Sequence, residues 1–369
     1  MGHDKLRKFA ENETFSCLLQ PSAQEVLADG YFHLRDHEVK GHWNERMFAK
    51  DQPIVLELGC GKGEYTIDLA QRNPQFNYIG VDIKGARLWK GAKYAHEHSL
   101  GNVAFLRTRI EFITAFFAPG EVSEIWLTFS DPQMKSENSR LSSPLFLERY
   151  RSFMKPGGIV HLKTDSRFLH EYTRAVCEAN SLKVLACTTD LYGTPREALL
   201  AGSGCCPAGS QPAADPSHLT MGPSLFRAEG GTSLQGSTGV LPVPETCDGS
   251  MTATAESSDL SVAKPASAGR PGRDFCDSKS WKGEKAAGDS RGQSPLKALT
   301  ASAVDAIYEV QTFYERMFLQ QGYKITYMSF VIDRDGQYVH PEFDEEYWRG
   351  VEGPRRSFDH QPTKGHKPE

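Results

Sequence analysis

The chain has 369 residues, of which 39% are apolar and 24% are charged, an ordinary composition for globular protein of about two domains. Its formal net charge of −5 excludes indiscriminate attraction to polyanions, so a nucleic-acid partner would have to meet a local basic patch. No apolar run approaches the roughly 20 residues that cross a bilayer, which predicts a soluble protein. The cysteines form no CxxC pair and no secretory leader precedes them, which predicts the reducing cytoplasm.

Composition then divides the chain into four parts, of which the first two are an N-terminal extension and a βα-rich region. Residues 1–50 are mixed and polar, without convincing periodicity. From Pro53 to about Thr189, short β-rich runs alternate with stretches of helical length, and this alternation predicts a mostly parallel sheet with helices on both faces. The runs are IVLELG, YIGVDI, VAFLR, EIWLTF, GIVHLKT and KVLACTT.

The other two parts are a low-complexity insertion and a polar tail. Residues 193–303 are dominated by Gly, Ala, Ser, Pro and Thr and cannot bury enough apolar surface to offset their ordering entropy, so they are predicted to be disordered. A helix follows at AIYEVQTFYERMFLQQG, with Gly322 as its stop signal, and YKITYMSFVI predicts a last strand before the tail, residues 333–369. The predicted fold is α/β, a seven-stranded sheet built from residues 51–192 and 304–332.

The stretch VLELGCGKGEYTIDLA predicts a ligand-binding turn. A strand ends at Glu57, and Gly59, Gly61 and Gly63 then allow a tight turn whose backbone can approach a ligand before a helix begins. The spacing differs from the dinucleotide fingerprint GxGxxG and favours a nucleoside ligand without a pyrophosphate. Asp82 ends the next strand, where an acid can meet ribose hydroxyls. The alternative is a glycine-rich turn that only connects two elements.

Two further acids follow predicted strands. In EIWLTFSDPQMKSENSR, Asp131 stands at the tip of a strand, with Lys135 and Arg140 beyond it; the alternative is an Asp-Pro turn among ordinary surface charges. Asp165 closes GIVHLKTD at the same carboxyl edge of the sheet, where open α/β folds bind ligands. As the N-cap of the next helix Asp165 would serve equally well.

Taken together, these motifs resemble the class I (Rossmann-like) S-adenosylmethionine-dependent methyltransferases. More narrowly, the chain resembles the bacterial tRNA (guanine-N7)-methyltransferases of the TrmB type, which modify the guanosine at tRNA position 46 in the variable loop. The resemblance covers residues 53–191 and about 305–330, and it is carried by LELGCGKG, VDIKGAR, WLTFSDPQMK, HLKTD and TFYE. It implies S-adenosylmethionine as methyl donor, no metal, a tRNA substrate and a monomer or homodimer.

The resemblance and the motifs together predict roles for individual residues. Cofactor binding falls to Glu57, Gly59, Gly61, Gly63, Asp82, Arg109 and Asp131. Substrate binding falls to Lys135, Arg140, Asp165, Thr312 and Glu315, and Asp131 is the acid at the catalytic position. Thr312 and Glu315 stand three residues apart on the predicted helix, so both can face one side.

The chemistry of guanine fits an acid at Asp131. N7 carries an in-plane lone pair and can attack a sulfonium methyl group without first losing a proton, so no strong base is required. Asp131 would instead accept hydrogen bonds from N1–H and the exocyclic amine, orient N7 and favour the positive charge that develops on the ring. Pro132 fixes the backbone after the acid, and Lys135 and Arg140 would meet flanking phosphates.

Arg109 departs from the family pattern, because an acid or amide that contacts the adenine amino group usually follows the third strand. Arginine cannot accept a hydrogen bond, so a backbone carbonyl or a neighbouring side chain would have to take over. This substitution keeps open a catalytically silent RNA-binding homologue, beside a methyltransferase of another RNA or of a small molecule.

Basic residues at every third position after Asp82 form a drifting cationic stripe, which is either simply solvated or a rail for tRNA phosphates. The stripe comprises Lys84, Arg87, Lys90 and Lys93. Cys205, Cys206, Cys247 and Cys276 lie in the low-complexity stretch without metal-ligand spacing, so no zinc site is predicted.

Overall fold

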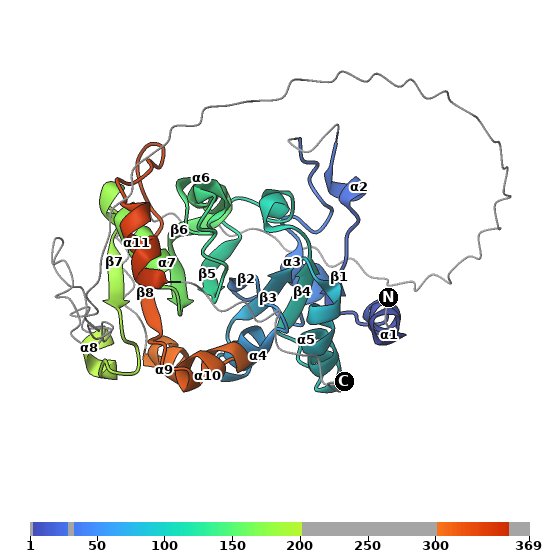
Figure 1. Cartoon of the computed structure of the whole chain (residues 1–369). Helices are drawn as coiled ribbons and strands as arrows, with labels where there is room; N and C mark the ends of the chain where they lie inside the picture. Colours follow the sequence, from blue (N-terminus) through green and yellow to red (C-terminus); the bar gives the residue numbers. More distant parts are fainter. Residues whose placement is uncertain (1–2, 29–32, 201–300, 354–369) are drawn as a thin grey trace, which may run out of the picture. The chain divides into compact units, whose positions relative to one another are not determined.

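The computed structural model describes residues 3–28, 33–200 and 301–353, all within one compact unit. They form an eight-stranded sheet with the order β1-β4-β3-β2-β5-β6-β8-β7 (Figure 1). The strands are β1 (Leu18–Leu19), β2 (Ile54–Leu58), β3 (Asn77–Asp82), β4 (Val103–Arg107), β5 (Val122–Thr128), β6 (Met154–Thr164), β7 (Val184–Thr188) and β8 (Thr326–Val331). Neighbouring strands are parallel, except that β8 runs antiparallel to both β6 and β7.

Seven strands correspond to the seven predicted runs, and the eighth, β1, comes from the N-terminal extension. β1 extends the β4 edge by parallel pairing of Leu18 with Phe105 and of Leu19 with Leu106. The Phe105 amide donates to the Cys17 carbonyl at 2.7 Å. A strand of two residues is too short to show the alternation from which strands are predicted, so the sequence indicated only seven.

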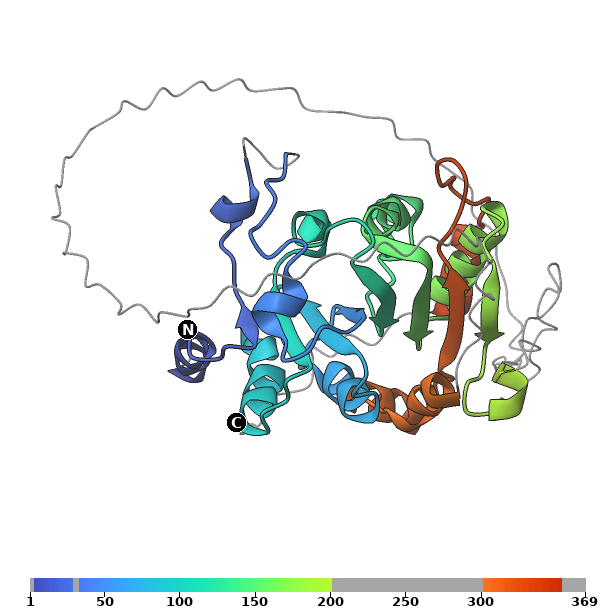
Figure 2. The same cartoon turned by 180° about the vertical axis from the view of Figure 1, so that it is seen from behind.

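Helices cover both faces of the sheet, as predicted (Figures 1 and 2). One face carries α4 (Glu64–Arg72), α5 (Gly85–Glu97) and α9 (Ala301–Glu309), and the other carries α6 (Pro144–Arg151) and α7 (Arg167–Ala179). In β2, Leu56 and Leu58 face the core under α6 and α7, whereas Val55 faces the core under α4 and α5. Because both faces are covered, the strand reads as a continuous apolar run.

The N-terminal extension is folded onto the sheet through α1 (His3–Asn12), α2 (Ala23–Val26) and α3 (Trp43–Met47). Trp43 is fully buried, stacks on Phe117 and donates its indole N–H to the Phe116 carbonyl at 2.8 Å. α1 packs against α5, where the Trp89 indole donates to Glu11 Oε2 at 2.6 Å. Isolated aromatic anchors of this kind leave no periodic pattern in the sequence.

The helix predicted over AIYEVQTFYERMFLQQG is two helices, so that prediction is wrong. α9 ends at Glu309, and α10 (Phe313–Gln320) begins after a break. Thr312 is the N-cap of α10, and its hydroxyl oxygen accepts the Glu315 amide at 3.2 Å. Gly322, with φ +82°, donates its amide to the Leu319 carbonyl at 3.0 Å and ends α10 as predicted.

The two sides of the predicted insertion are joined to each other. α8 (Arg196–Leu200) and the start of α9 fall inside the range 193–303, so the predicted boundaries differ from the structure at both ends. Arg196 forms ion pairs with Asp305 at 2.6 Å and Glu309 at 3.2 Å, and the Tyr308 hydroxyl donates to the Thr194 carbonyl at 2.6 Å. Within that range, residues 201–300 lie outside the described residues.

The predicted C-terminal tail also contains a helix, α11 (Glu345–Glu352). The Asp344 carboxylate accepts the Tyr347 amide at 2.9 Å and caps the start of the helix. At the other end, the Glu352 carboxylate accepts the Phe168 amide of α7 at 3.0 Å. Residues 333–353 are therefore part of the folded unit.

Within the described ranges, no helix combines the length and the apolar character that crossing a bilayer requires. The same ranges gather no three His, Cys, Asp or Glu side chains in an arrangement that could hold a metal ion. The four cysteines of the low-complexity stretch lie outside these ranges.

Candidate active site

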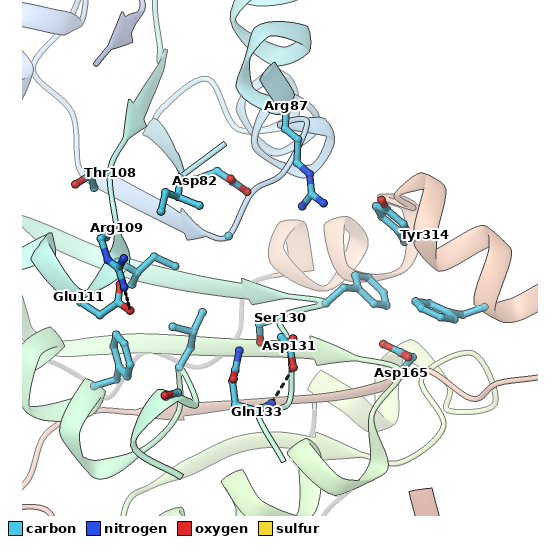
Figure 3. A pocket seen from close by; sticks show the side chains of 18 residues that line it. Asp82, Arg87, Thr108, Arg109, Glu111, Ser130, Asp131, Gln133, Asp165 and Tyr314 are labelled. Carbon is cyan, nitrogen blue, oxygen red and sulfur yellow. Dashed lines mark hydrogen bonds and ion pairs between the residues drawn. The ribbon is translucent and has the colours of Figure 1, made fainter. Parts of the chain in front are cut away.

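A pocket of about 570 Å³ opens at the carboxyl edge of the parallel strands (Figure 3). Most of its wall comes from residues at or after the ends of five neighbouring strands and from α10. These residues include Gly59 after β2, Asp82 and Ile83 at β3, Thr108 to Glu111 after β4, Phe129 to Asp131 after β5, Asp165 after β6, and Tyr314 and Phe318 of α10. The site lies where open α/β sheets bind ligands, and its volume falls in the range of roughly 300–1,000 Å³ typical of small-molecule sites.

The glycine turn takes left-handed backbone at all three predicted positions: φ is +81° at Gly59, +59° at Gly61 and +71° at Gly63. A Cβ on Gly63 would come within 2.6 Å of the Phe105 ring, so only glycine fits there. The Asp82 carboxylate accepts the Gly61 amide at 3.0 Å, which ties the turn to the end of β3. Gly59 and Asp82 therefore reach the pocket wall together.

Glu57 lies behind the turn and not on the pocket wall. Its buried carboxylate accepts the hydroxyls of Thr66 and Thr128, the latter at 2.5 Å. Burial raises the pKa of Glu57 to about 7, and the two threonine hydrogen bonds act in the opposite direction. The side chain supports the turn from inside the protein, and its predicted contact with the cofactor stays a prediction.

Arg109 does line the pocket, and it brings an acid with it. Its exposed guanidinium pairs with Glu111 at 3.2 Å, and both side chains lie on the wall after β4 (Figure 3). Glu111 supplies the hydrogen-bond acceptor that Arg109 lacks. The sequence reasoning missed Glu111, although an acid two residues after the expected position was a signal for it.

Asp131 lies on the pocket wall in a loop with unusual backbone, the Asp131 loop (residues 129–140). φ is +51° at Phe129 and +46° at Gln133, which is uncommon for residues other than glycine. The Asp131 carboxylate accepts the Gln133 amide at 2.9 Å and otherwise stays exposed. Ser130 beside it has a buried hydroxyl without a hydrogen-bond partner among the described residues, so the wall offers an unused polar group to a ligand.

Asp165 and Lys135 take different positions around this pocket. Asp165 lines it, while Ser166 is the N-cap of α7 and accepts the Leu169 amide at 3.1 Å. The N-cap role that could have explained Asp165 thus belongs to its neighbour. Lys135 is exposed further along the Asp131 loop and does not line the pocket.

Arg140 is the clearest departure from the predicted substrate contacts. Its side chain is 0% exposed, pairs with Glu345 at 2.8 Å and lies over the rings of Phe168 and Tyr172. A guanidinium enclosed in this way cannot meet a phosphate, so the structure corrects the prediction: Arg140 anchors the end of the Asp131 loop.

Thr312 and Glu315 are also placed differently from the prediction, because Thr312 precedes the helix. Glu315 is 0% exposed, pairs with the equally buried Lys163 at 2.8 Å and accepts the Tyr192 hydroxyl at 2.6 Å. Burial lowers the pKa of Lys163 despite the neighbouring carboxylate. Within TFYE it is Tyr314 that reaches the pocket.

Lys163 also donates to the carbonyls of Ile307, at 2.6 Å, and Val310, at 3.0 Å. Its ammonium therefore holds the last turn of α9 as well as Glu315 at the start of α10. This buried cation thus lies at the break between the two helices and contacts both of them.

The cationic stripe of α5 is partly neutralised. Lys90 pairs with Glu64 at 2.8 Å, and Lys93 lies 3.7 Å from Glu97. Arg87, by contrast, lines the pocket and points into it (Figure 3). The stripe thus contributes one cation to the pocket and paired charges to the surface beyond.

Comparison with known proteins gives consistent matches. A family described as "Putative methyltransferase" matches residues 51–198. A tRNA (guanine-N(7)-)-methyltransferase of Christiangramia forsetii is 53% identical over 191 residues, which are 51% of this chain and 83% of that protein. The proteins of the same name from Bacteroides thetaiotaomicron and Porphyromonas gingivalis are 52% and 55% identical, over 52% and 49% of this chain and 74% and 72% of theirs.

Proposed function

The chain belongs to the tRNA (guanine-N7)-methyltransferase family, the TrmB type of class I methyltransferases, and on this premise we propose that it methylates N7 of guanine 46 in the variable loop of tRNA. The observation that carries the proposal is the meeting of the glycine turn, Asp82, Asp131 and Asp165 in one pocket. A monomeric or homodimeric state stays a prediction of the sequence.

The pocket fits S-adenosylmethionine, whose sulfonium supplies an electrophilic methyl group. Asp82 ends β3 as an acceptor for ribose hydroxyls, and Gly59 leaves the backbone open to close approach. Glu111 offers an acceptor for the adenine amino group, and the unpartnered Ser130 hydroxyl offers a further polar contact. Because Glu111 is present, Arg109 no longer favours a catalytically silent homologue.

Asp131 acts on the guanine through orientation and charge. Its exposed carboxylate can accept hydrogen bonds from guanine N1–H and the exocyclic amine, which turns N7 toward the methyl donor. In the transfer the N7–methyl bond forms with the N7 lone pair and the sulfur–methyl bond breaks, so no proton needs to leave. The positive charge passes from sulfur to the ring, where the carboxylate stabilises it.

Five other side chains are proposed to hold the tRNA. Asp165 and Arg87 lie on the pocket wall, where they can contact the guanosine and its phosphate, and Lys135 is exposed for a phosphate beyond. Tyr314 and Phe318 offer aromatic surface for a base that has left its stack.

We propose that the methyltransferase domain is wider than residues 51–192 and 304–332. It includes the N-terminal segment that Trp43 anchors and the C-terminal helix α11, because both pack onto the sheet unit. Residues 201–300 are then an insertion between α8 and α9.

The function is tested by incubating unmodified tRNA with S-adenosylmethionine labelled in the methyl group and mapping the labelled base. We expect one label per tRNA, on N7 of guanine 46, and none on a transcript in which that guanine is replaced by adenine. Label on another base would contradict the assigned position, and the absence of label from every RNA tested would contradict the substrate class.

The cofactor assignment predicts that Asp82→Ala weakens S-adenosylmethionine binding by about 1–3 kcal/mol, because hydrogen bonds to a charged group are lost. Calorimetric titration of the folded variant measures this change. Asp335→Ala removes an exposed carboxylate outside the pocket wall and is the matched control. Equal affinities of the two variants would remove Asp82 from the site.

A further inference from the structure

We infer that the C-terminal helix α11 positions the catalytic loop, with Arg349 and Glu345 as positioning residues for Asp131. The inference rests on the proposed function for the role of Asp131, but the contacts that carry it do not. They join residues 344–352 to the Asp131 loop across more than 200 positions of sequence, 215 in the case of Arg349 and Met134.

The first contact is between α11 and the backbone of the loop. Arg349 Nη2 donates to the Met134 carbonyl at 2.6 Å, three residues beyond Asp131. The same guanidinium pairs with Glu345 one turn earlier on the helix. Glu345 in turn pairs with the buried Arg140 at 2.8 Å, so one face of α11 holds both the middle and the end of the Asp131 loop.

The backbone of the loop explains why an outside support is needed. Phe129 and Gln133, on either side of Asp131, both have left-handed backbone, and such residues persist only where their surroundings fix them. Phe129 is fixed because its amide donates to the Lys163 carbonyl at 2.9 Å. On the other side, Arg349 holds the residue directly after Gln133.

A second connection links the loop to its neighbours at Glu137. Its carboxylate accepts the Tyr172 hydroxyl at 2.9 Å and lies 3.0 Å from His340 Nδ1, which belongs to the segment leading into α11. Because Glu352 binds the start of α7 at the far end, α11 is anchored at both ends and can serve as a fixed support.

Substitution of Arg349 can distinguish positioning of the Asp131 loop by α11 from simple burial of core residues under that helix. Its side chain is 44% exposed, so its removal uncovers little apolar surface. What is lost is the donor to the Met134 carbonyl and the ion pair with Glu345. We therefore expect Arg349 variants to change the geometry of the loop while the protein remains folded.

The test compares Arg349→Ala with the wild-type enzyme in tRNA methylation. We expect kcat to fall roughly 10-fold, as for a small misplacement of a catalytic group. S-Adenosylmethionine affinity should stay within about 2-fold, because the cofactor side of the pocket is untouched. Arg349→Lys, which keeps a donor, should recover part of kcat.

A matched pair on the same helix turn controls for effects on α11 itself. Glu345→Gln and Glu346→Gln remove equal charges from the first turn, but only Glu345 contacts Arg349 and Arg140. We expect only Glu345→Gln to lower kcat. Loss of kcat in both would assign the effect to the helix and overturn the inference.

Hydrogen–deuterium exchange provides a reading that does not depend on catalysis. In Arg349→Ala, the amides of residues 131–140 should exchange faster, while those of α5 should be unchanged. Wild-type kcat together with wild-type exchange would overturn the inference. A wild-type enzyme that methylates no tRNA guanine would instead overturn the proposed function, and the exchange data would still decide the role of α11.

Discussion

Asp131→Asn is expected to lower the rate of tRNA methylation roughly 10²-fold or more, the scale for loss of a preorganised electrostatic contact. The amide keeps the shape of the side chain but loses the negative charge that stabilises the methylated ring. S-Adenosylmethionine affinity should be nearly unchanged, because the Asp82 end of the pocket remains intact.

Single-turnover rates with saturating tRNA, together with a cofactor titration, separate these two effects. Asp335→Asn is the control, since its exposed side chain lies outside the pocket wall. Turnover close to the wild-type rate would show that Asp131 has no electrostatic role. A parallel loss of cofactor affinity would show that Asp131 contacts S-adenosylmethionine and not only the guanine.

Lys163→Met is expected to reduce the free energy of unfolding by about 3–5 kcal/mol, the cost of leaving a buried charge without its partner. The substitution would strand the Glu315 carboxylate, which is 0% exposed. It would also remove the donor from two carbonyls at the end of α9. Chemical denaturation measures the change.

Two variants sharpen this measurement. Lys155→Met replaces an exposed lysine on the same strand and should cost little. Lys163→Met combined with Glu315→Gln should recover part of the loss, because no charge then remains unpaired. A single variant as stable as Lys155→Met would mean that the pair contributes nothing to stability.

The sheet could be predicted because its strands carry local signals. Each of the seven runs is apolar over a strand length and is separated from the next by a helical stretch, and acids at the strand ends predicted a common edge. Gly59, Asp82, Asp131 and Asp165 do meet in one pocket for that reason.

The remaining features depend on contacts between distant parts of the chain. Arg140 and Lys163 look like surface cations in the sequence, and only Glu345 and Glu315 make their burial possible. The break between α9 and α10 likewise needs a cation from β6. α11 has no apolar run from which it could be predicted. Phe343, just before the helix, contacts Phe168 of α7 and stacks on Trp348 of α11.

Non-covalent contacts join the segment around α8 to α9, so the two are held together independently of the chain that connects them. They are the ion pairs of Arg196 with Asp305 and Glu309 and the hydrogen bond from Tyr308 to Thr194. β8, which completes the sheet between β6 and β7, belongs to the downstream piece. A cut between residues 200 and 301 would therefore leave two polypeptides that share one sheet. The two ends made by this cut could serve as the new termini of a circularly permuted enzyme. The cut could also divide the enzyme into two halves that reassemble.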